Sequence, residues 1–210
     1  MPEFSDVRHT LEERARLADA VRALLEEIVS ADITDNDAAA TEATIESVTE
    51  SLRALPRRGL RPARLPDLND LQPSFFADPI IGASNPVAPP VSVVVEDGVV
   101  RGRVSLGAPY EGPPGHVHGA IIAGIFDMLL GLANIAAGNP GMTGTLTIRY
   151  REPTPLHTDL AIECWTDKVE GRKIFTLGTL HAGDTLCAEA KGLFVSLGSA
   201  KAAAIFENRR

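Results

Sequence analysis

Two features in the middle of the chain have the residue types that hydrolytic chemistry requires. Asp127 is the one charged residue in a mostly apolar run of about twenty residues, which begins at His118-Gly119. A carboxylate in such surroundings is costly unless it is paired or takes part in a reaction. If a helix begins at Gly119, its first backbone N–H groups lack intrahelical partners and can stabilise a developing negative charge. The pattern therefore predicts a base or nucleophile and an oxyanion site.

Each of these residues also has a purely structural explanation. Asp127 could hold a buried backbone group or hydroxyl, His118 could cap the helix, and Gly119 could serve close packing. His116 is a weaker candidate, because nothing places it on the helix. The combination follows a proline- and glycine-rich loop at residues 112–115, and together these features favour the functional interpretation.

The interval of nine residues between His118 and Asp127 constrains this site. On an α-helix, nine residues advance by about 13.5 Å and rotate by about 900°, which leaves the two side chains on opposite faces. One small reacting group cannot touch both within a single chain. If both residues act, the spacing predicts a site between two subunits, with two antiparallel copies of the helix related by a two-fold axis.

Composition and charge exclude several classes of function. The chain of 210 residues suffices for one well-buried domain with an appendage. A formal net charge of −8 argues against nucleic acid or an anionic membrane as the main partner. No G-x-S-x-G, Walker A or dinucleotide-binding motif is present, and no cluster of residues has metal-ligand spacing. We therefore expect no metal and no cofactor.

The cysteines and the termini of the chain bear on its compartment. Cys164 and Cys187 lack C-x-x-C spacing, and we expect two reduced thiols within strands, with a disulfide between paired strands as the alternative. The charged N-terminus lacks the apolar core of a signal peptide, which predicts a cytoplasmic protein. Residues 119–138 are nearly long enough to span a membrane, but Asp127 near the centre would cost about 2.5–3.5 kcal/mol. We expect a buried helix instead.

An N-terminal extension, residues 1–55, is predicted to hold two amphipathic helices. Apolar residues recur at steps of three and four over 7–30 and 37–55. A capping-box pattern places the start of the first helix near Leu11. The candidate caps of the second helix are Thr34, Asp35 and Asn36. We expect these helices to pack on a larger body or on a partner chain.

Residues 56–90 contain eight prolines, a density that excludes regular helix or central strand. This connecting segment still carries phenylalanine and isoleucine side chains, so part of it should lie on the core. It also carries four arginines, which form a solvated basic face or meet an anionic group: Arg57, Arg58, Arg61 and Arg64.

From Val91 the apolar period falls to two, which is typical of strands. Residues 91–107 predict two strands joined by a turn at Asp97-Gly98. Four more strands are predicted at 143–151, 159–168, 173–182 and 185–197. Short loops require antiparallel neighbours. The domain, residues 91–198, is therefore predicted to be α+β, with an antiparallel sheet of five or six strands that wraps round the apolar helix. A charged tail, 199–210, follows.

The run GPPGHVHGA at 112–120, followed by Asp127, resembles the hotdog-fold acyl-CoA thioesterases. With NPVAPP, IRYREPTPL and DKVEGRKIF, the resemblance extends over residues 85–198. The branch is the PaaI-like and THEM4-like part of the 4HBT thioesterase superfamily. The resemblance implies a hotdog domain, acyl-CoA as substrate, and a homodimer or dimer of dimers with two sites at the interface.

The resemblance also implies roles for individual residues. Asp127 matches a catalytic aspartate that acts as general base or nucleophile. Gly119 matches the backbone donor to the thioester carbonyl, His118 a histidine that supports that site, and Thr143 a hydroxyl that assists the aspartate. The positions that match CoA contacts are Arg149, Arg151, Arg172 and Lys173.

Two residues depart from the family pattern. Ala120 replaces a frequent second glycine. Gly112 stands where some branches place an Asn or Gln that donates to the oxyanion.

We therefore expect a cytoplasmic thioesterase that converts acyl-CoA to free acid and CoA, without nucleic acid or membrane as a partner. Three alternatives remain open. The domain could bind acyl-CoA without turnover as a regulatory module, or it could be an enoyl-CoA hydratase, which shares the fold. Separately, the helices within 7–55 could act mainly in oligomerisation.

Overall fold

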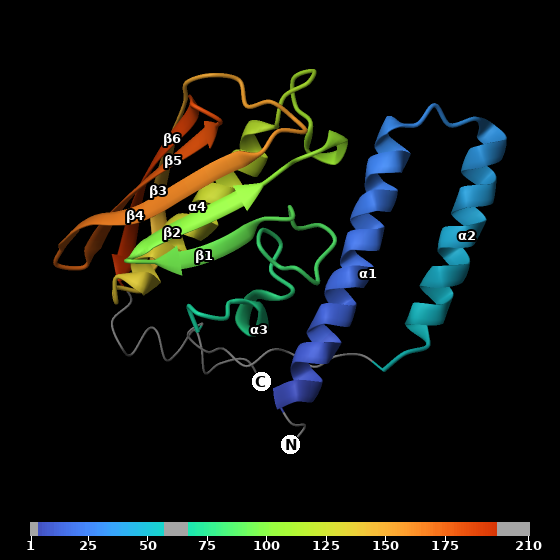
Figure 1. Ribbon diagram of the computed structural model, residues 1–210, viewed down its shortest axis with the longest axis horizontal. Helices are drawn as coiled ribbons and strands as arrows, with labels where there is room; N and C mark the ends of the chain where they lie inside the picture. Colours follow the sequence, from blue (N-terminus) through green and yellow to red (C-terminus); the bar gives the residue numbers. More distant parts are fainter. Residues whose placement is uncertain (1–3, 57–66, 197–210) are drawn as a thin grey trace.

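A computed structural model describes residues 4–56 and 67–196 of the chain (Figure 1). The four arginines at 57–64 and the predicted tail at 199–210 lie outside the described residues. The helices are α1 (Phe4–Ser30), α2 (Asp35–Arg53), α3 (Gln72–Phe75), the 3₁₀ helix η1 (Ala108–Tyr110) and α4 (Gly119–Ala136). The strands are β1 (Ser92–Glu96), β2 (Val99–Val104), β3 (Gly141–Tyr150), β4 (Leu160–Glu170), β5 (Lys173–Ala182) and β6 (Thr185–Ser196).

The strands form one antiparallel sheet in the order β1-β2-β4-β5-β6-β3, which curves around α4 (Figure 1). The predicted turn joins β1 to β2, with Asp97 at φ 52° and Gly98 at φ 75°. All six strands lie close to their predicted positions. Short turns connect β4, β5 and β6 in sequence, as predicted. The prediction of a hotdog fold, with a sheet wrapped round one apolar helix, is confirmed.

The core lies between α4 and the concave face of the sheet, where α4 contacts β2, β3, β4, β5 and β6. Its buried residues include Ile125, Phe126 and Leu129. Among the described residues α4 is the one helix long and apolar enough to cross a membrane. Its composition is explained by the sheet, which packs against it along most of its length.

Both cysteines are buried and free, so the prediction of two reduced thiols is confirmed and the alternative of a disulfide is wrong. Cys164 lies on β4 beneath Gly178 of β5, where an added Cβ would come 2.8 Å from the Cys164 sulfur. Burial raises the pKa of the Cys164 thiol well above its ordinary value. The thiol therefore behaves as an apolar core group.

Two helices form the N-terminal extension, as predicted. Thr34 caps α2: its hydroxyl accepts a hydrogen bond from Asp37 N, and the Asp37 carboxylate accepts one from Thr34 N. The predicted start of the first helix near Leu11 is wrong, because α1 begins at Phe4. The residues before Leu11 include no proline or glycine after Pro2, so the capping-box pattern is not sufficient to end the helix there.

α1 is attached to the sheet domain by a partly buried arginine, Arg22. The Arg22 guanidinium donates to the carbonyls of the Pro-rich segment at Ala88 (2.9 Å) and Asn85 (2.8 Å). It also donates to the carbonyls of Gly82 and Ala83. The neighbouring side chains of Phe76, Ile81 and Ala88 are buried, so this part of the segment lies on the core as expected. α2, by contrast, has no buried residue.

Candidate active site

Asp127 and Thr143 meet on the side of α4 that the sheet leaves open. The Thr143 hydroxyl donates a hydrogen bond of 2.8 Å to Asp127 Oδ1. Thr143 is positioned by the start of β3, beside an irregularity in the pairing with β6 between Thr143 and Thr145. Both side chains are exposed in the single chain. The expectation that the carboxylate is buried is therefore wrong, because β3 is an edge strand and no further strand among the described residues covers this side of α4.

His118 and Gly119 form the start of α4. His118 is the N-cap, and its ring atom Nδ1 accepts a hydrogen bond of 3.0 Å from Ala120 N. In the neutral ring the proton is therefore on Nε2. Gly119 is the first helical residue, so its N–H has no acceptor within the helix, and we find none elsewhere in the described part of the chain. The cap is the structural role considered for His118, and it leaves Gly119 N–H available.

The loop before the helix is fixed by its own backbone. Gly112 N donates to His116 O, and Gly115, at φ 76°, donates to the Glu111 carboxylate. A Cβ at Gly112 would lie 2.8 Å from the Cα of His118. The position therefore has no room for the Asn or Gln side chain of other branches, which gives this departure a steric cause.

Tyr150 is a site residue that sequence reasoning missed. Its hydroxyl donates a hydrogen bond of 2.8 Å to the carbonyl of Gly119. A Cβ added at Gly119 would lie 3.1 Å from the Tyr150 hydroxyl oxygen. Burial raises the pKa of Tyr150, so the hydroxyl stays protonated and donates at neutral pH. In the sequence, Tyr150 follows Leu146 and Ile148 at steps of two residues, so it resembles an ordinary strand residue on the core-facing side. Only the packing of β3 against α4 reveals its contact.

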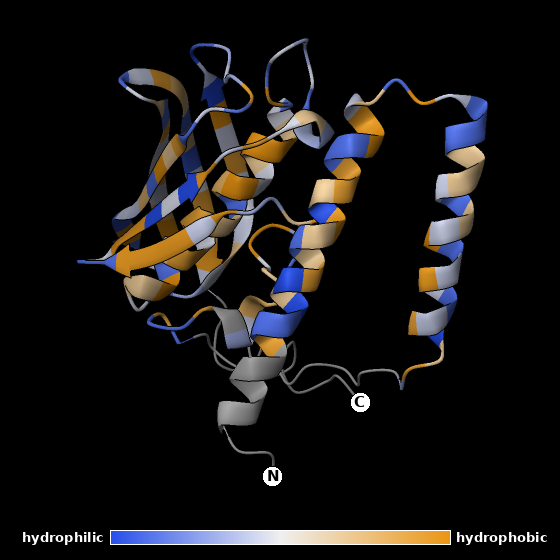
Figure 2. Cartoon of the chain, turned by 45° about the vertical axis from the view of Figure 1, so that its right-hand side comes forward, coloured by the Kyte–Doolittle hydropathy of each residue, from blue (hydrophilic) through white to orange (hydrophobic). Residues whose placement is uncertain are grey.

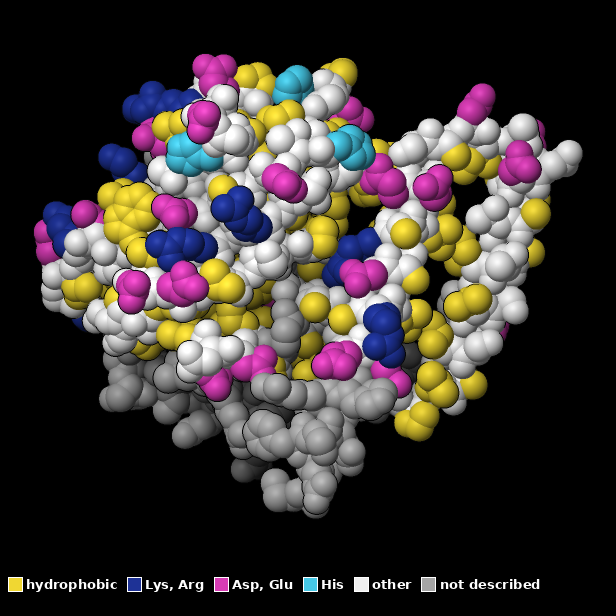
Figure 3. All heavy atoms as spheres, in the orientation of Figure 1, with side chains coloured by type: hydrophobic (Ala, Val, Ile, Leu, Met, Phe, Trp, Pro, Cys, Tyr) yellow, Lys and Arg dark blue, Asp and Glu magenta, His cyan; other side chains and the backbone are white. Residues whose placement is uncertain are grey.

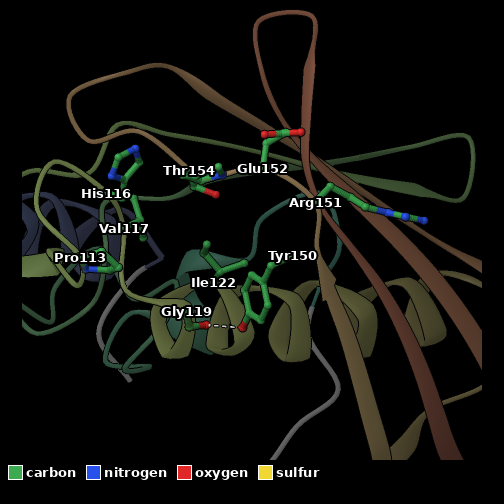
Figure 4. Close-up of a pocket in the computed structure, with 10 residues that line it drawn as sticks. Pro113, His116, Val117, Gly119, Ile122, Tyr150, Arg151, Glu152 and Thr154 are labelled. Carbon is green, nitrogen blue, oxygen red and sulfur yellow. Dashed lines mark hydrogen bonds between the residues drawn. The ribbon is translucent and has the colours of Figure 1, made fainter.

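An open pocket of about 630 Å³ adjoins Gly119 (Figure 4). Gly119, Ile122 and Tyr150 line one side. The residues that line the rest come from the loop and the chain after β3: Pro113, His116, Val117, Arg151, Glu152, Pro153 and Thr154. The Thr154 hydroxyl is buried and has no hydrogen-bond partner among the described residues. Thr154 is thus a buried polar residue in the wall of the pocket.

In one chain, the predicted catalytic residues fall into two separate groups. Thr143 holds Asp127 near the start of β3, and Tyr150 holds Gly119 at its end. Seven residues separate Thr143 from Tyr150, which corresponds to about 23 Å at ~3.3 Å per residue of strand. The carboxylate and the free N–H therefore do not meet within a single chain, as the helical spacing predicts.

The four predicted CoA-binding cations divide in the same way. Arg149 and Arg151 flank Tyr150, and Arg151 forms an ion pair with Glu189 (2.5 Å). Arg172 and Lys173 lie at the β4–β5 turn, where Arg172 Nε donates to Ser196 O at 3.3 Å. Ser196 pairs with Gly141 at the start of β3. One pair of cations thus accompanies Gly119 and the other pair lies nearer Asp127.

Within the described residues no group of three or more His, Cys, Asp or Glu side chains could hold a metal ion. The polar groups of the site are a carboxylate, hydroxyls, backbone N–H groups and the His118 ring. Such a set can activate water and stabilise an oxyanion.

A family model for the thioesterase superfamily matches residues 114–191. A thioesterase superfamily protein of known crystal structure is 35% identical to this chain, with a TM-score of 0.77, and the match covers 87% of this chain and 90% of that protein. The chain therefore belongs to the thioesterase superfamily.

Curated relatives identify the branch. The chain is 39% identical over 104 residues to acyl-coenzyme A thioesterase THEM4 from Mus musculus, and 39% identical over 92 residues to THEM4 from Xenopus laevis. These matches cover 45% and 41% of the two relatives, so the chain matches less than half of their length. The resemblance to the THEM4-like branch that the motif predicted is confirmed.

Proposed function

We propose that this protein is an acyl-CoA thioesterase, which hydrolyses the thioester to a free acid and CoA at sites shared by two copies of the chain. The observation that carries the proposal is the placement of the Asp127–Thr143 pair at one end of β3 and the free Gly119 N–H at the other. The names of the curated relatives, which are acyl-coenzyme A thioesterases, support the substrate class.

The edge strand β3 supports the pairing of two copies. It is ten residues long, and no strand in the described part of the chain pairs with its outer edge. Such an edge favours pairing with another strand. An antiparallel β3–β3 contact centred on Thr147 would pair Leu146 with Ile148 of the other copy. With Gly144 as the extra residue of the irregularity between Thr143 and Thr145, Thr143 of each copy would then lie close to Tyr150 of the other. Because Thr143 holds Asp127 and Tyr150 holds Gly119, this register brings a carboxylate and a free N–H together twice, as a two-fold axis requires.

The same pairing would collect the cations. Arg149 and Arg151 of one copy would approach the β3 start of the second copy, beside which Arg172 and Lys173 lie. Strands are spaced about 4.8 Å apart, so the two pairs would come within a few strand widths of each other. Four cations around one site suit the phosphates of CoA.

In the proposed reaction, the substrate carbonyl oxygen accepts a hydrogen bond from Gly119 N–H. Asp127 accepts a proton from water, and the resulting hydroxide attacks the carbonyl carbon. The oxyanion is stabilised by Gly119 N–H and by the positive end of the α4 dipole. The C–S bond then breaks, the CoA thiolate takes the proton that Asp127 accepted from water, and CoA leaves as the thiol together with the free acid. Thr143 holds the carboxylate in place, and direct attack by Asp127 is the alternative first step.

The test is thiol release from a panel of short, long and aryl acyl-CoAs, with wild type and with Asp127→Asn. The substitution removes the proton acceptor but keeps the shape and the hydrogen bond to Thr143. A general base contributes about 10²–10⁴-fold, so we expect kcat to fall by that factor with thermal stability unchanged. An Asp127→Asn enzyme with wild-type turnover would exclude the assigned role.

Binding of acyl-CoA without thiol release by wild type would favour the regulatory module, and addition of water to an enoyl-CoA would favour the hydratase.

Glu163→Gln on the outer part of β4 serves as a matched control, because that carboxylate pairs with Arg101 far from α4. Homodimerisation and a cytoplasmic location stay predictions.

A further inference from the structure

The N-terminal extension carries apolar side chains that its own chain does not cover. On α2 and just after it, Ile45, Val48, Leu52 and Leu55 are exposed to 37, 55, 44 and 57%. On α1, the large apolar residues exposed in the same way are Leu17, Leu24, Leu25, Ile28 and Val29. α1 buries a different face, with Leu11 and Ala18, against the sheet domain. The extension therefore has unpartnered apolar surface on both helices.

These side chains form two regular stripes. The α2 stripe, 45-48-52-55, has steps of three, four and three residues, and the α1 stripe, 17-21-24-28, has steps of four, three and four. Alternation of three and four is the heptad spacing of helices that pack side by side along their length. Each stripe covers about three turns, so the two surfaces match in length as well as in spacing.

The two stripes lie on either side of an open space. Figures 1 and 2 show α2 standing away from the sheet domain, with α1 between them. Figure 3 shows hydrophobic side chains on the facing sides of the two helices, with a gap between them. α2 has no buried residue, whereas most of the stability of a helix in a protein comes from the packing of its apolar face. A partner for this face would therefore stabilise α2.

The extension is shared with a solved relative. Residues 57–210 make up only about three quarters of this chain, whereas the match to the thioesterase superfamily crystal structure covers 87% of it at a TM-score of 0.77. The match must therefore include part of the N-terminal extension.

We propose that the space between α1 and α2 receives the α2 helix of a second copy of this chain. The two α2 helices would lie antiparallel about a two-fold axis, and each would also contact the α1 stripe of the other copy. A helix from a second copy has the length and spacing that the space requires, because the same stripe forms one of its walls. The exchange fills both spaces at once and closes the assembly.

This contact is separate from the proposed β3–β3 pairing. In Figure 1 the extension lies on the opposite side of the molecule from the β6–β3 part of the sheet, and the proposal does not rest on thioesterase activity. With both contacts present, the chain would form a dimer of dimers.

Cysteine crosslinking tests the contact directly, because the two native cysteines are buried. Val48→Cys places a thiol at the centre of the stripe. Ala43→Cys, on an exposed position about 140° around the same helix, is the matched control. Under mild oxidation, we expect Val48→Cys to give a disulfide-linked species of twice 22.3 kDa, at least tenfold more than Ala43→Cys. Equal yields, or no dimer from Val48→Cys, would overturn the proposal.

Solution mass provides a second readout. Val48→Glu/Leu52→Glu adds two charges to the stripe, and Ala40→Glu/Ser51→Glu adds the same charges at exposed positions on the flank of α2, about 90° from the stripe. By light scattering, we expect the first variant to have half the mass of wild type and the control to match wild type. Neither variant touches the core, so both should keep the unfolding temperature of the sheet domain. The same mass for all three proteins would exclude a contact through α2.

Discussion

The oxyanion role of Gly119 can be tested by removing its N–H without removing the helix start. Gly119→Pro deletes the donor, and proline is well tolerated at the first position of a helix. Proline also requires an extended residue before it, and His118 already has φ −63° and ψ 130°. The substitution is therefore compatible with the local backbone. Gly119→Ala is the matched control, because it adds a Cβ but keeps the N–H.

The expected magnitudes differ for the two variants. Loss of one oxyanion donor costs about 2.7–4 kcal/mol of transition-state stabilisation, or ~10²–10³ in kcat. The Cβ of either variant would lie 3.1 Å from the Tyr150 hydroxyl, the free end of a half-exposed side chain that can move by a few tenths of an ångström. We therefore expect Gly119→Ala to lose only about 2–10-fold, the effect of weakening one hydrogen bond.

The assay is steady-state thiol release over a range of acyl-CoA concentrations, with thermal unfolding as a check on the fold. The role predicts a fall in kcat for Gly119→Pro that exceeds the fall for Gly119→Ala by about two orders of magnitude. If both variants lose the same activity, the added Cβ accounts for the loss and the N–H is not an oxyanion donor.

Two further predictions concern the Tyr150 hydroxyl and the buried Cys164 thiol. Tyr150→Phe removes the hydrogen bond to Gly119 O but keeps the ring, so kcat should fall by about 2–10-fold with KM little changed; an unchanged kcat in the thiol-release assay would show that Tyr150 does not position the helix start. Burial raises the pKa of Cys164 in the folded chain, so the folded state holds its proton where the unfolded thiol has lost it. The contribution of this thiol to stability is therefore complete below the ordinary thiol pKa of 9.0 and falls as pH rises above it. Urea unfolding of wild type and Cys164→Ala between pH 8 and about 10.5 should show a steeper loss for wild type, and parallel curves would contradict the assignment.

The sheet and the central helix could be predicted from the sequence because each has a distinct period. Strands β4, β5 and β6 are joined by turns at Gly171 and Gly183, both with positive φ, so their antiparallel pairing follows from local chain geometry. The apolar run after Gly119 is continuous, and only a helix surrounded by a sheet can bury it on several sides.

The exposure of Asp127 and the contact of Tyr150 could not be predicted in the same way. Both depend on the position of β3, which follows α4 in sequence but pairs with β6, the last strand. That long-range pairing makes β3 an edge strand and leaves one side of α4 open. No local pattern encodes it. The division of the four cations between the two ends of β3 has the same origin, because their sequence positions do not reveal the order of the strands.

The bond between Arg22 and the carbonyls of the Pro-rich segment has a consequence for how the chain can be shortened. Prolines at 86, 89 and 90 have no N–H to donate, so this segment cannot form a ladder of its own, and α1 supplies the donors instead. Trimming the protein to the region that resembles smaller relatives would remove Arg22 and its hydrogen bonds to the carbonyls of Asn85 and Ala88, which would keep only the bonds from Ala88 N and the Tyr110 hydroxyl. We therefore expect the stable folding unit to begin within α1. Amide exchange should protect α1 together with the sheet, whereas the backbone of α2 should exchange faster whenever copies of the chain are kept apart.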